Sequence, residues 1–364
     1  MKKIVVCGGH LTPALALIEA LEKKEDYFII FFGRKKATDG SNNLSAEFRE
    51  VGKRNIPFVD IISGRLTRKL TKYTIPSLFK IPLGFALSLA YLVKYRPSAV
   101  VAFGGYLSTP VIFSAWFLGI DSITHEQAVV PGLANRINSL FVSKFFVTWP
   151  QTQKYFSRKT EVIGNPQPAS LAKRVSSDKK LNAIISGKTN LILVMGGAQG
   201  SHIINNLVFD NLDLLDKFFV FHQIGTADYK GDHQKAAKIK KSNYFKTDYI
   251  SPEDFGAVLE KAKFVISRSG ANTVWDLATL AKPAILIPLP IAAGDEQTKN
   301  ARILETAGSA IIVSQKNLSR ESLKVAIDKI QKSLGTYQLK AKAFQKTLPQ
   351  ESTQKLVQYI YQIL

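Results

Sequence analysis

Short apolar segments alternate along the chain with longer segments that repeat apolar positions at helical spacing. The short segments predict strands at residues 3–7, 27–32, 58–62, 99–103, 120–125, 145–148, 190–195, 218–223, 264–267 and 284–288. The longer segments predict helices that include one from Pro13 and those at residues 43–53, 77–94 and 111–118. Strands that alternate with helices are typical of parallel sheets covered on both faces.

This alternation falls into two blocks, which a polar stretch rich in Lys and Ser separates. We therefore predict an α/β chain of two doubly wound, Rossmann-like domains that face a cleft. The predicted boundaries are residues 1–166 for the first domain, 167–188 for a linker and 189–345 for the second domain. Ligands of such sheets bind beyond the carboxyl ends of the strands.

The 364-residue chain is strongly basic, with 49 Lys and Arg against 28 Asp and Glu, a net charge of +21. This charge favours anionic partners: nucleic acid, phosphorylated ligands or an anionic membrane. The one cysteine, Cys7, excludes an internal disulfide, and no Cys/His spacing typical of zinc is present. We therefore expect an intracellular protein without a metal site.

Neither of the two most apolar segments of the chain is predicted to insert into a membrane. The apolar run before Gly8 is too short for the core of a signal peptide. The longest uncharged stretch, residues 97–120, is broken by Gly104, Gly105 and Pro110 into a strand, a loop and a helix. We expect no signal peptide and no transmembrane segment.

Two loops of small residues follow strands of the second block and precede helices. In residues 196–201, glycines let backbone N–H groups approach a phosphate, and the helix dipole favours its charge. Residues 268–273 leave similar room, and Asp276 on the next helix can accept hydrogen bonds from a ribose. The alternatives are a tight turn without a ligand and a Ser-capped helix with a surface Asp.

Three further positions carry candidate chemistry. Residues 296, 297 and 300 lie within about one helical turn and suit hydrogen bonds to sugar hydroxyls, although a polar helix start is the alternative. His10, at the end of the first strand, is a candidate general base, and Glu126 at the end of another strand is the second candidate. Either side chain can instead be purely structural. No G-x-S-x-G elbow is present, which disfavours a serine hydrolase of that type.

A segment that is basic and apolar, without acidic residues, extends over residues 61–120. It predicts a peripheral contact with an anionic membrane surface, to which each cation contributes on the order of 1 kcal/mol. No nucleic-acid-binding signature accompanies the charge, so we expect no nucleic acid partner. A solvated basic face is the alternative. The predicted membrane patch consists of Arg65, Arg68, Lys69, Lys72, Tyr73, Ile75, Leu78 and Phe79.

Taken in order, these motifs resemble the bacterial UDP-N-acetylglucosamine–N-acetylmuramyl-(pentapeptide) pyrophosphoryl-undecaprenol N-acetylglucosamine transferases, the MurG family. The resemblance extends over nearly the whole chain. It rests on GGHLTPALAL (8–17), FGGYLSTP (103–110), HEQAVVPGLANR (125–136), VIGNP (162–166), GGAQGSHIIN (196–205), HQIG (222–225), SRSGANTVWDLA (267–278) and DEQTKNARILETAGSA (295–310). Several such segments in one order are more specific than any single glycine motif.

The resemblance implies a GT-B fold in which a C-terminal helix, residues 346–364, returns to the first domain. It implies an inverting transfer of GlcNAc from UDP-GlcNAc to the C4 hydroxyl of the MurNAc unit of lipid I, an undecaprenyl-diphosphate-linked muramyl peptide. The product is lipid II, so the implied role is in peptidoglycan synthesis and, through it, in cell wall biogenesis, cell shape and cell division. It implies no cofactor and no metal, and a peripheral location on the cytoplasmic face of the cell membrane.

The resemblance also assigns residues to the two substrates. The donor side is Gly197, Ala198, Gln199, Gly200, Ser201, Arg268, Ser269, Gly270, Ala271, Asn272, Thr273, Asp276, Glu296, Gln297 and Asn300. The acceptor side is Gly8, Gly9, Gly104, Gly105, Tyr106, Gln127 and Asn135, with His10 or Glu126 as the base. The first glycine loop is shorter than is usual in the family. Another lipid acceptor, a UDP-GlcNAc epimerase of the same fold and a non-catalytic nucleotide-sugar-binding protein remain the alternatives.

Overall fold

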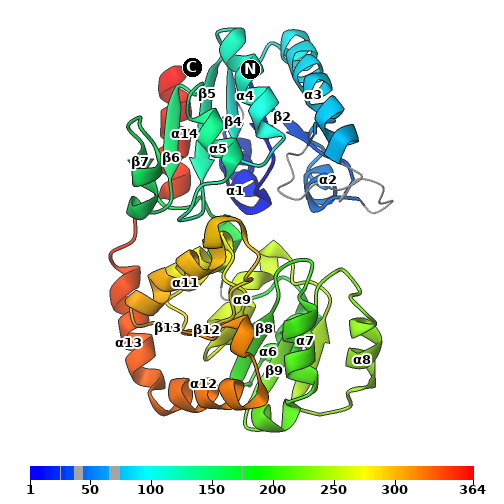
Figure 1. Ribbon diagram of the computed structural model, residues 1–364, viewed down its shortest axis with the longest axis vertical. Coiled ribbons are helices and arrows are strands. Elements are labelled where there is room, and N and C mark those ends of the chain that lie inside the picture. Colours follow the sequence, from blue (N-terminus) through cyan, green and yellow to red (C-terminus); the bar gives the residue numbers. More distant parts are fainter. Residues whose placement is uncertain (25, 37–43, 65–73, 174) are drawn as a thin grey trace. The chain divides into compact units, whose positions relative to one another are not determined.

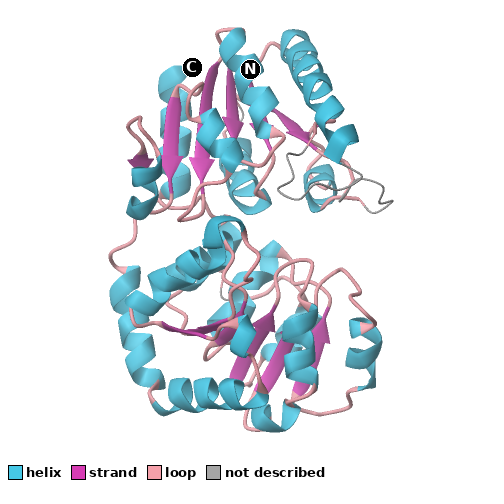
Figure 2. Cartoon of the chain, in the orientation of Figure 1, coloured by secondary structure: helices cyan, strands magenta, loops and turns pink. Residues whose placement is uncertain are grey.

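The computed structural model describes residues 1–24, 26–36, 44–64, 74–173 and 175–364, apart from the side chains of residues 74–78 and 293. The chain forms two compact units, which we describe separately (Figure 1). Unit 1 consists of Met1–Pro168 and Pro349–Leu364, and unit 2 consists of Ala169–Leu348. Each unit is a parallel sheet with helices on its faces (Figure 2).

Unit 1 has seven strands within its described residues, all parallel, in the order β3-β2-β1-β4-β5-β6-β7. The strands are β1 (Lys2–Cys7), β2 (Tyr27–Gly33), β3 (Phe58–Asp60), β4 (Ala99–Ala102), β5 (Asp121–Glu126), β6 (Lys144–Val147) and β7 (Glu161–Val162). The helices are α1 (Leu11–Glu22), α2 (Ala46–Gly52), α3 (Thr74–Tyr95), α4 (Ser108–Phe117), α5 (Leu133–Asn138) and α14 (Ser352–Ile363), with a 3₁₀ turn η1 (Pro150–Tyr155).

Unit 2 has six parallel strands among its described residues, in the order β10-β9-β8-β11-β12-β13. The strands are β8 (Leu191–Met195), β9 (Phe219–Gln223), β10 (Tyr244–Thr247), β11 (Val265–Ser267), β12 (Ala284–Leu286) and β13 (Ala310–Ile312). The α-helices are α6 (Lys179–Ile185), α7 (His202–Phe209), α8 (Asp232–Lys238), α9 (Pro252–Lys261), α10 (Ala271–Thr279), α11 (Glu296–Thr306), α12 (Arg320–Lys332) and α13 (Leu334–Gln345). Short 3₁₀ turns are η2 (Ala169–Ala172), η3 (Leu212–Leu215), η4 (Ala293–Asp295) and η5 (Gln315–Asn317). These two sheets confirm the predicted doubly wound α/β class.

The continuous apolar strands are explained by burial of both sheet faces. On β1, Ile4 and Val6 join one apolar cluster, while Val5 and Cys7 join another on the opposite face. Successive side chains of a strand point to opposite faces, so a central parallel strand must be apolar throughout.

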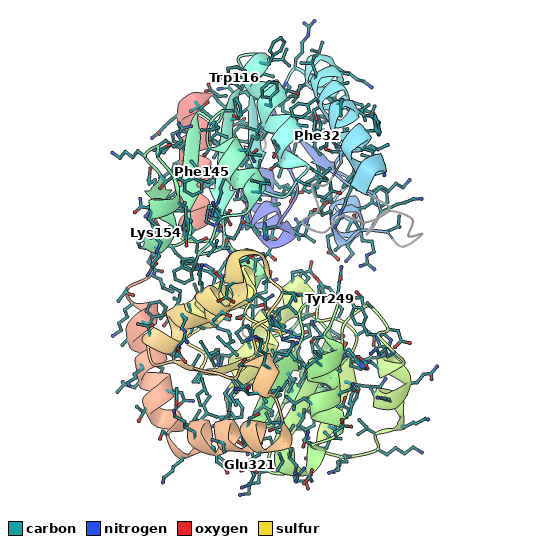
Figure 3. All side chains as sticks on the ribbon, viewed as in Figure 1. Phe32, Trp116, Phe145, Lys154, Tyr249 and Glu321 are labelled. Carbon is teal, nitrogen blue, oxygen red and sulfur yellow. The ribbon has the colours of Figure 1, made fainter. Side chains whose placement is uncertain are left out.

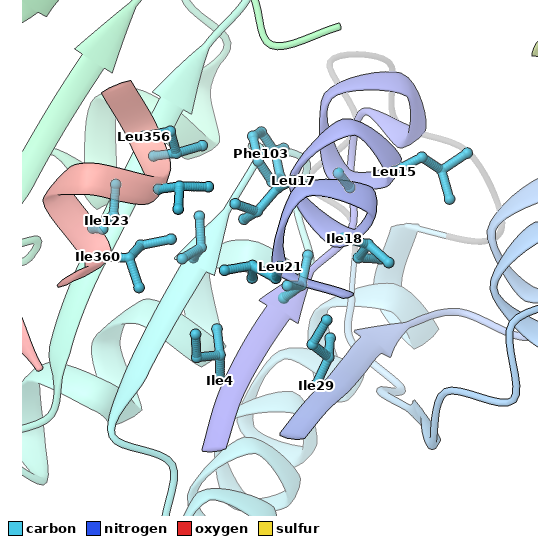
Figure 4. Packing of buried hydrophobic residues seen from close by; sticks show 14 of the residues in the cluster. Ile4, Leu15, Leu17, Ile18, Leu21, Ile29, Phe103, Ile123, Leu356 and Ile360 are labelled. Carbon is cyan, nitrogen blue, oxygen red and sulfur yellow. The ribbon is translucent and has the colours of Figure 1, made fainter. Parts of the chain in front are cut away.

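Helix α14 belongs to unit 1 although it lies at the end of the chain. It packs against α1 and contributes Leu356, Val357 and Ile360 to the cluster that contains Leu17 and Leu21 (Figure 4). The apolar face of this helix therefore closes one side of the first sheet.

The segment expected as a linker, residues 167–188, is mostly folded into unit 2. It contains η2 and α6. Ser176 Oγ and Ser177 N donate hydrogen bonds to the carboxylate of Asp254 on α9, the second at 3.1 Å. These bonds tie the segment to the second sheet.

Within the described residues, no helix is both long enough and apolar enough to span a membrane.

Candidate functional site

Each sheet reverses its strand order at one point, between β1 and β4 in unit 1 and between β8 and β11 in unit 2. Doubly wound sheets bind ligands outside the carboxyl ends of the strands at this point. The loops that the sequence singled out are the ones that follow these four strands. They are residues 8–10 and 103–107 in unit 1, and residues 196–201 and 268–270 in unit 2.

The two glycine loops of unit 1 pack backbone against backbone. Gly9, Gly104 and Gly105 all have positive φ, at 144°, 77° and 76°. A Cβ on Gly9 would lie 2.0 Å from the Gly104 carbonyl oxygen, and one on Gly105 would lie 2.9 Å from Gly9 Cα. These glycines are therefore required for the close approach of the loops, whatever ligand the loops bind.

His10 stands at the N-cap of α1, half-buried, at this junction. Its Nδ1 lies 2.9 Å from the carbonyl oxygen of Phe103. A carbonyl only accepts, so Nδ1 carries the proton and donates, and the lone pair of the neutral ring lies on Nε2. Among the described residues Nε2 has no hydrogen-bond partner. A ring held in this tautomer is suited to accept a proton from a substrate hydroxyl.

Glu126, the second candidate base, is 2% exposed and saturated with donors. Its Oε1 accepts from Ala128 N at 3.0 Å, and its Oε2 accepts from Gly132 N at 3.2 Å and Asn135 Nδ2 at 3.0 Å. A carboxylate engaged in this way fixes the loop between β5 and α5. The geometry therefore favours His10 over Glu126 as the base.

Two residues predicted on the acceptor side, Gln127 and Asn135, are buried rather than exposed to a ligand. Gln127 Nε2 donates to Nδ1 of His125 at 3.2 Å, and Asn135 Nδ2 donates to the His125 carbonyl at 3.1 Å. Desolvation lowers the pKa of His125 to about 4, so its ring is neutral and Nε2 donates to Gly164 O at 2.8 Å. Both residues hold the end of β5 in place. Tyr106 is half-buried against the apolar cluster of the opposite face.

In unit 2, the loop after β8 contains one glycine that is tightly packed and one that borders open space. Gly200 has φ 87°, and a Cβ there would lie 2.0 Å from Ile224 O. Gly197 has φ 96°, and a Cβ there would meet nothing within 4 Å. Between them Ala198 and Gln199 are exposed. One glycine thus serves packing, while the other borders open space that a ligand can enter.

Arg268 connects three of the loops from the interior. It is 8% exposed; its Nη1 donates to Ile287 O at 3.0 Å and its Nη2 donates to Ser201 Oγ at 2.9 Å. Burial lowers its pKa, yet a guanidinium stays charged at neutral pH. No carboxylate pairs with it in the described part of the chain. Its uncompensated positive charge favours an anion at the carboxyl ends of β8 and β11.

The start of α10 is open to a ligand. Its N-cap, Gly270, provides no side-chain cap, and a Cβ there would meet nothing within 4 Å. Asn272 and Thr273 in the first turn are half-buried. Backbone N–H groups at such an end are suited to bind phosphate oxygens. Asp276, further along α10, is buried.

The predicted sugar-binding residues lie beside this helix start. Ser269 Oγ donates to Gln297 O at 2.8 Å, and Asn300 Nδ2 donates to Ser269 O at 3.3 Å. Gln297 Oε1 accepts from Leu289 N at 3.0 Å, which leaves its Nε2 to donate. Glu296 Oε1 accepts from Asn300 Nδ2 at 3.4 Å. The start of α11 therefore lies beside the start of α10.

The predicted membrane patch is only partly visible. Arg65, Arg68, Lys69, Lys72 and Tyr73 lie outside the described residues, as do the side chains of Ile75 and Leu78. Phe79 on α3 is 77% exposed. Trp116 and Phe117, at the end of α4, were not among the predicted patch residues, yet they are 52% and 67% exposed. Figure 3 labels Trp116. Their helix was assigned to the core because its apolar run looked buried.

Glu47 on α2 is a further residue that was not predicted from the sequence. Its carboxylate accepts hydrogen bonds from Gly9 N at 3.2 Å and Arg34 N at 3.4 Å. The sequence feature that could have identified it is an acidic residue in the first turn of the helix that follows the second strand. Among the described residues, no group of three or more His, Cys, Asp or Glu side chains is placed to hold a metal ion.

Comparisons with known proteins agree with this geometry. The glycosyltransferase family 28 N-terminal domain matches residues 7–147, and the family 28 C-terminal domain matches residues 191–357. The chain is 34% identical over 317 residues to the UDP-N-acetylglucosamine--N-acetylmuramyl-(pentapeptide) pyrophosphoryl-undecaprenol N-acetylglucosamine transferase of Treponema denticola, covering 84% of this chain and 81% of that protein.

Two further proteins extend the likeness to the full length of the chain. The transferase of the same name from Geobacillus kaustophilus is 32% identical over 346 residues, covering 93% of this chain and 92% of that protein. The crystal structure of Acinetobacter baumannii MurG matches with a TM-score of 0.74 and 26% identity over all of both chains. The chain therefore belongs to the MurG family of N-acetylglucosamine transferases, which have the GT-B glycosyltransferase fold.

Proposed function

We propose that this protein transfers GlcNAc from UDP-GlcNAc to the C4 hydroxyl of the MurNAc unit of lipid I, with inversion, and so forms lipid II for peptidoglycan synthesis. The named relatives support the donor and the acceptor. The observation that carries the chemistry is the orientation of His10, whose Nδ1 is bound to a carbonyl and whose Nε2 is the basic nitrogen.

In the proposed reaction, His10 Nε2 accepts the proton of the attacking hydroxyl as its oxygen bonds to the anomeric carbon. The bond between that carbon and the β-phosphate oxygen breaks, and the electron pair leaves with UDP. Attack from the face opposite UDP inverts the configuration. Negative charge grows on the diphosphate, where the N-terminus of α10 and the guanidinium of Arg268 stabilise it.

The remaining donor contacts follow from the arrangement of α10 and α11. Gln297 Nε2 and Asn300 suit the hydroxyl and amide groups of the GlcNAc ring. The buried carboxylate of Asp276 suits the ribose hydroxyls. Gln199 and Ala198 line the diphosphate from the loop after β8.

The test uses radiolabelled UDP-GlcNAc, a detergent-dispersed lipid I analogue and a control without acceptor. We expect transfer that depends on the acceptor, and a loss of kcat of about 10²- to 10⁴-fold in His10→Ala. Glu126→Gln is expected to lower thermal stability together with activity, because it breaks a structural network. UDP release or sugar isomerisation without acceptor would instead support the epimerase alternative, and binding without turnover would support a non-catalytic role.

We further propose that the protein is peripheral, on the cytoplasmic face of the cell membrane, and that the outer surface of α3 and α4 contacts anionic lipid. Helix α3 packs against α4. Phe79 on α3 and Trp116 and Phe117 on α4 leave large apolar side chains exposed. Residues 61–120 have seven basic and no acidic side chains, which complements an anionic lipid surface.

Sedimentation with vesicles tests this surface. Wild-type protein is expected to bind vesicles that contain phosphatidylglycerol and to bind neutral vesicles weakly. The double variant Trp116→Ser, Phe117→Ser is expected to lose most of this binding, because it removes two exposed aromatic anchors. Leu339→Ser, at an apolar position in unit 2 that is also more than half exposed, is the control and should bind as the wild type does. Equal binding of all three proteins would refute the assignment.

A further inference from the structure

Glu47 lies at the junction of the first two strands of unit 1, where no substrate contact has been assigned to it. Its Oε1 lies 3.2 Å from Gly9 N and its Oε2 lies 3.4 Å from Arg34 N, both of which donate. A Cβ on Gly8 would lie 2.8 Å from Oε1. The carboxylate therefore packs directly on the glycine turn that precedes His10.

The helix that carries Glu47 is held at its start. Ser45, the N-cap of α2, accepts a hydrogen bond from Phe48 N at 3.0 Å and donates one to Arg34 O at 2.5 Å. These bonds fix the first turn of α2 against the end of β2. These hydrogen bonds of Ser45 therefore fix the backbone position of Glu47, which lies in the first turn of α2.

The charge of Glu47 acts on the groups around it. Desolvation raises the pKa of the Glu47 carboxyl, while the hydrogen bond and charge of Arg34, the hydrogen bond from Gly9 and the charge of His10 lower it. Burial, and then the charge of Glu47, raises the pKa of the Cys7 thiol at the end of β1. Glu47 is therefore electrostatically coupled to both ends of the loop.

Coupling between two titrating groups is reciprocal. If the charge of His10 favours ionised Glu47, ionised Glu47 favours the imidazolium form of His10 by the same amount. The other titratable group beside His10 is His125 on β5, which is neutral because burial lowers its pKa to about 4. The charges of Arg34 and of His10 both lower the pKa of Glu47, so Glu47 is coupled to each of these two groups.

We propose that Glu47 is a positioning residue for His10: its carboxylate holds the Gly8-Gly9 turn and stabilises the imidazolium that forms when His10 accepts the proton of the acceptor hydroxyl. The identity of that hydroxyl rests on the function proposed above, but the coupling between Glu47 and His10 does not. One consequence is that the N–H of Gly9 is already donated to a protein carboxylate. This turn is then a support for the base rather than a free cradle for the acceptor diphosphate.

The first test is a pH titration of the full chain labelled with ¹⁵N-histidine. The chain has five histidines, and His10→Gln assigns the His10 signals. Glu47→Gln is expected to lower the pH midpoint of the His10 titration, because the neighbouring negative charge is removed. Glu50→Gln, on the same helix but paired with Lys53, should leave the midpoint unchanged. An unchanged midpoint in Glu47→Gln overturns the proposal.

A second measurement covers the case in which Glu47→Gln does not fold. The carboxyl carbon of Glu47 is titrated by ¹³C spectroscopy in wild type and in His10→Gln, whose substitution is at a half-buried position. The midpoint of Glu47 should rise when the positive charge of His10 can no longer form. Equal midpoints in the two proteins would contradict the coupling.

Kinetics then separate a role in catalysis from a role in folding. In Glu47→Gln, the acidic limb of the kcat/KM profile should move to lower pH and the plateau kcat should fall about three- to tenfold. The KM for UDP-GlcNAc should not change, because the donor loops belong to unit 2. Loss of activity without movement of the acidic limb would refute the electrostatic role. If the wild type transfers nothing to lipid I, the proposed function fails while the two titrations still decide the role of Glu47.

Discussion

Replacement of Gly200 by Ala should destabilise unit 2 far more than the same replacement at Gly197, even without a ligand. Both glycines lie in the loop after β8 and both have positive φ, at 87° and 96°. At Gly200 the added Cβ would lie 2.0 Å from the Ile224 carbonyl oxygen, where ordinary contact begins at 3.4 Å. At Gly197 it would meet nothing within 4 Å.

The magnitudes follow from these two geometries. An Ala in the left-handed region costs about 1–2 kcal/mol, which applies to both variants. Overpacking adds about 1–3 kcal/mol, and it applies at Gly200 alone because its neighbour is backbone that is itself bonded into the loops. We therefore expect a loss of about 2–5 kcal/mol in the free energy of unfolding for Gly200→Ala and of about 1–2 kcal/mol for Gly197→Ala.

Urea unfolding followed by tryptophan fluorescence measures these losses, since Trp275 is buried in α10 of unit 2. Calorimetric titration with UDP-GlcNAc measures the effect on donor binding. Gly197→Ala is expected to weaken binding more than its small loss of stability explains, because its Cβ enters the space left open beside the loop. Equal losses of stability in the two variants would refute the packing role of Gly200.

Three further outcomes are expected. His125 and His222 are neutral when buried, with pKa values lowered by desolvation to about 4 and about 3, so unfolding takes up protons and stability should fall as pH drops below 6.5. The loss for His125 reaches about 3 kcal/mol near pH 4, and urea unfolding that is flat from pH 6.5 to 4.5 would contradict it. Leu356→Ala should cost about 2–5 kcal/mol by thermal or urea unfolding, against less than about 0.5 kcal/mol for the exposed control Leu339→Ala. Arg268→Gln should weaken UDP-GlcNAc binding about tenfold or more by calorimetry, whereas unchanged affinity would exclude its charge from the donor site.

The central strands of both sheets were predictable because burial on two faces makes them continuously apolar. The predicted strands at residues 3–7 and 190–195 agree with β1 and β8 to within one residue. The strands that the pattern missed are β7, β10 and β13. Each lies at an edge of its sheet or is very short, and β10 is only half-buried. Edge strands need less apolar surface, so their hydrophobic signal is weak.

The positions of the candidate residues along the strands were also predictable, but the directions of their side chains were not. A residue at the carboxyl end of a parallel strand must lie at one edge of the sheet, and His10, Glu126 and Ser269 do lie at or just beyond the carboxyl ends of their strands. Whether such a side chain points outward or inward depends on which hydrogen-bond donors the folded loops place beside it. Glu126 turns inward because three donors from residues 128–135 surround it.

The glycines show why sequence alone could not separate packing from ligand binding. Gly9 and Gly200 have a positive φ and a neighbouring backbone so close that no side chain fits. Gly197 and Gly270 border open space, and at Gly270 φ is ordinary, so neither clash nor strain explains the glycine there. In a sequence all four follow a strand and look alike. Only the surroundings of the missing Cβ distinguish them: the first pair is required for backbone packing, and the second pair borders open space, where we propose that the donor diphosphate binds.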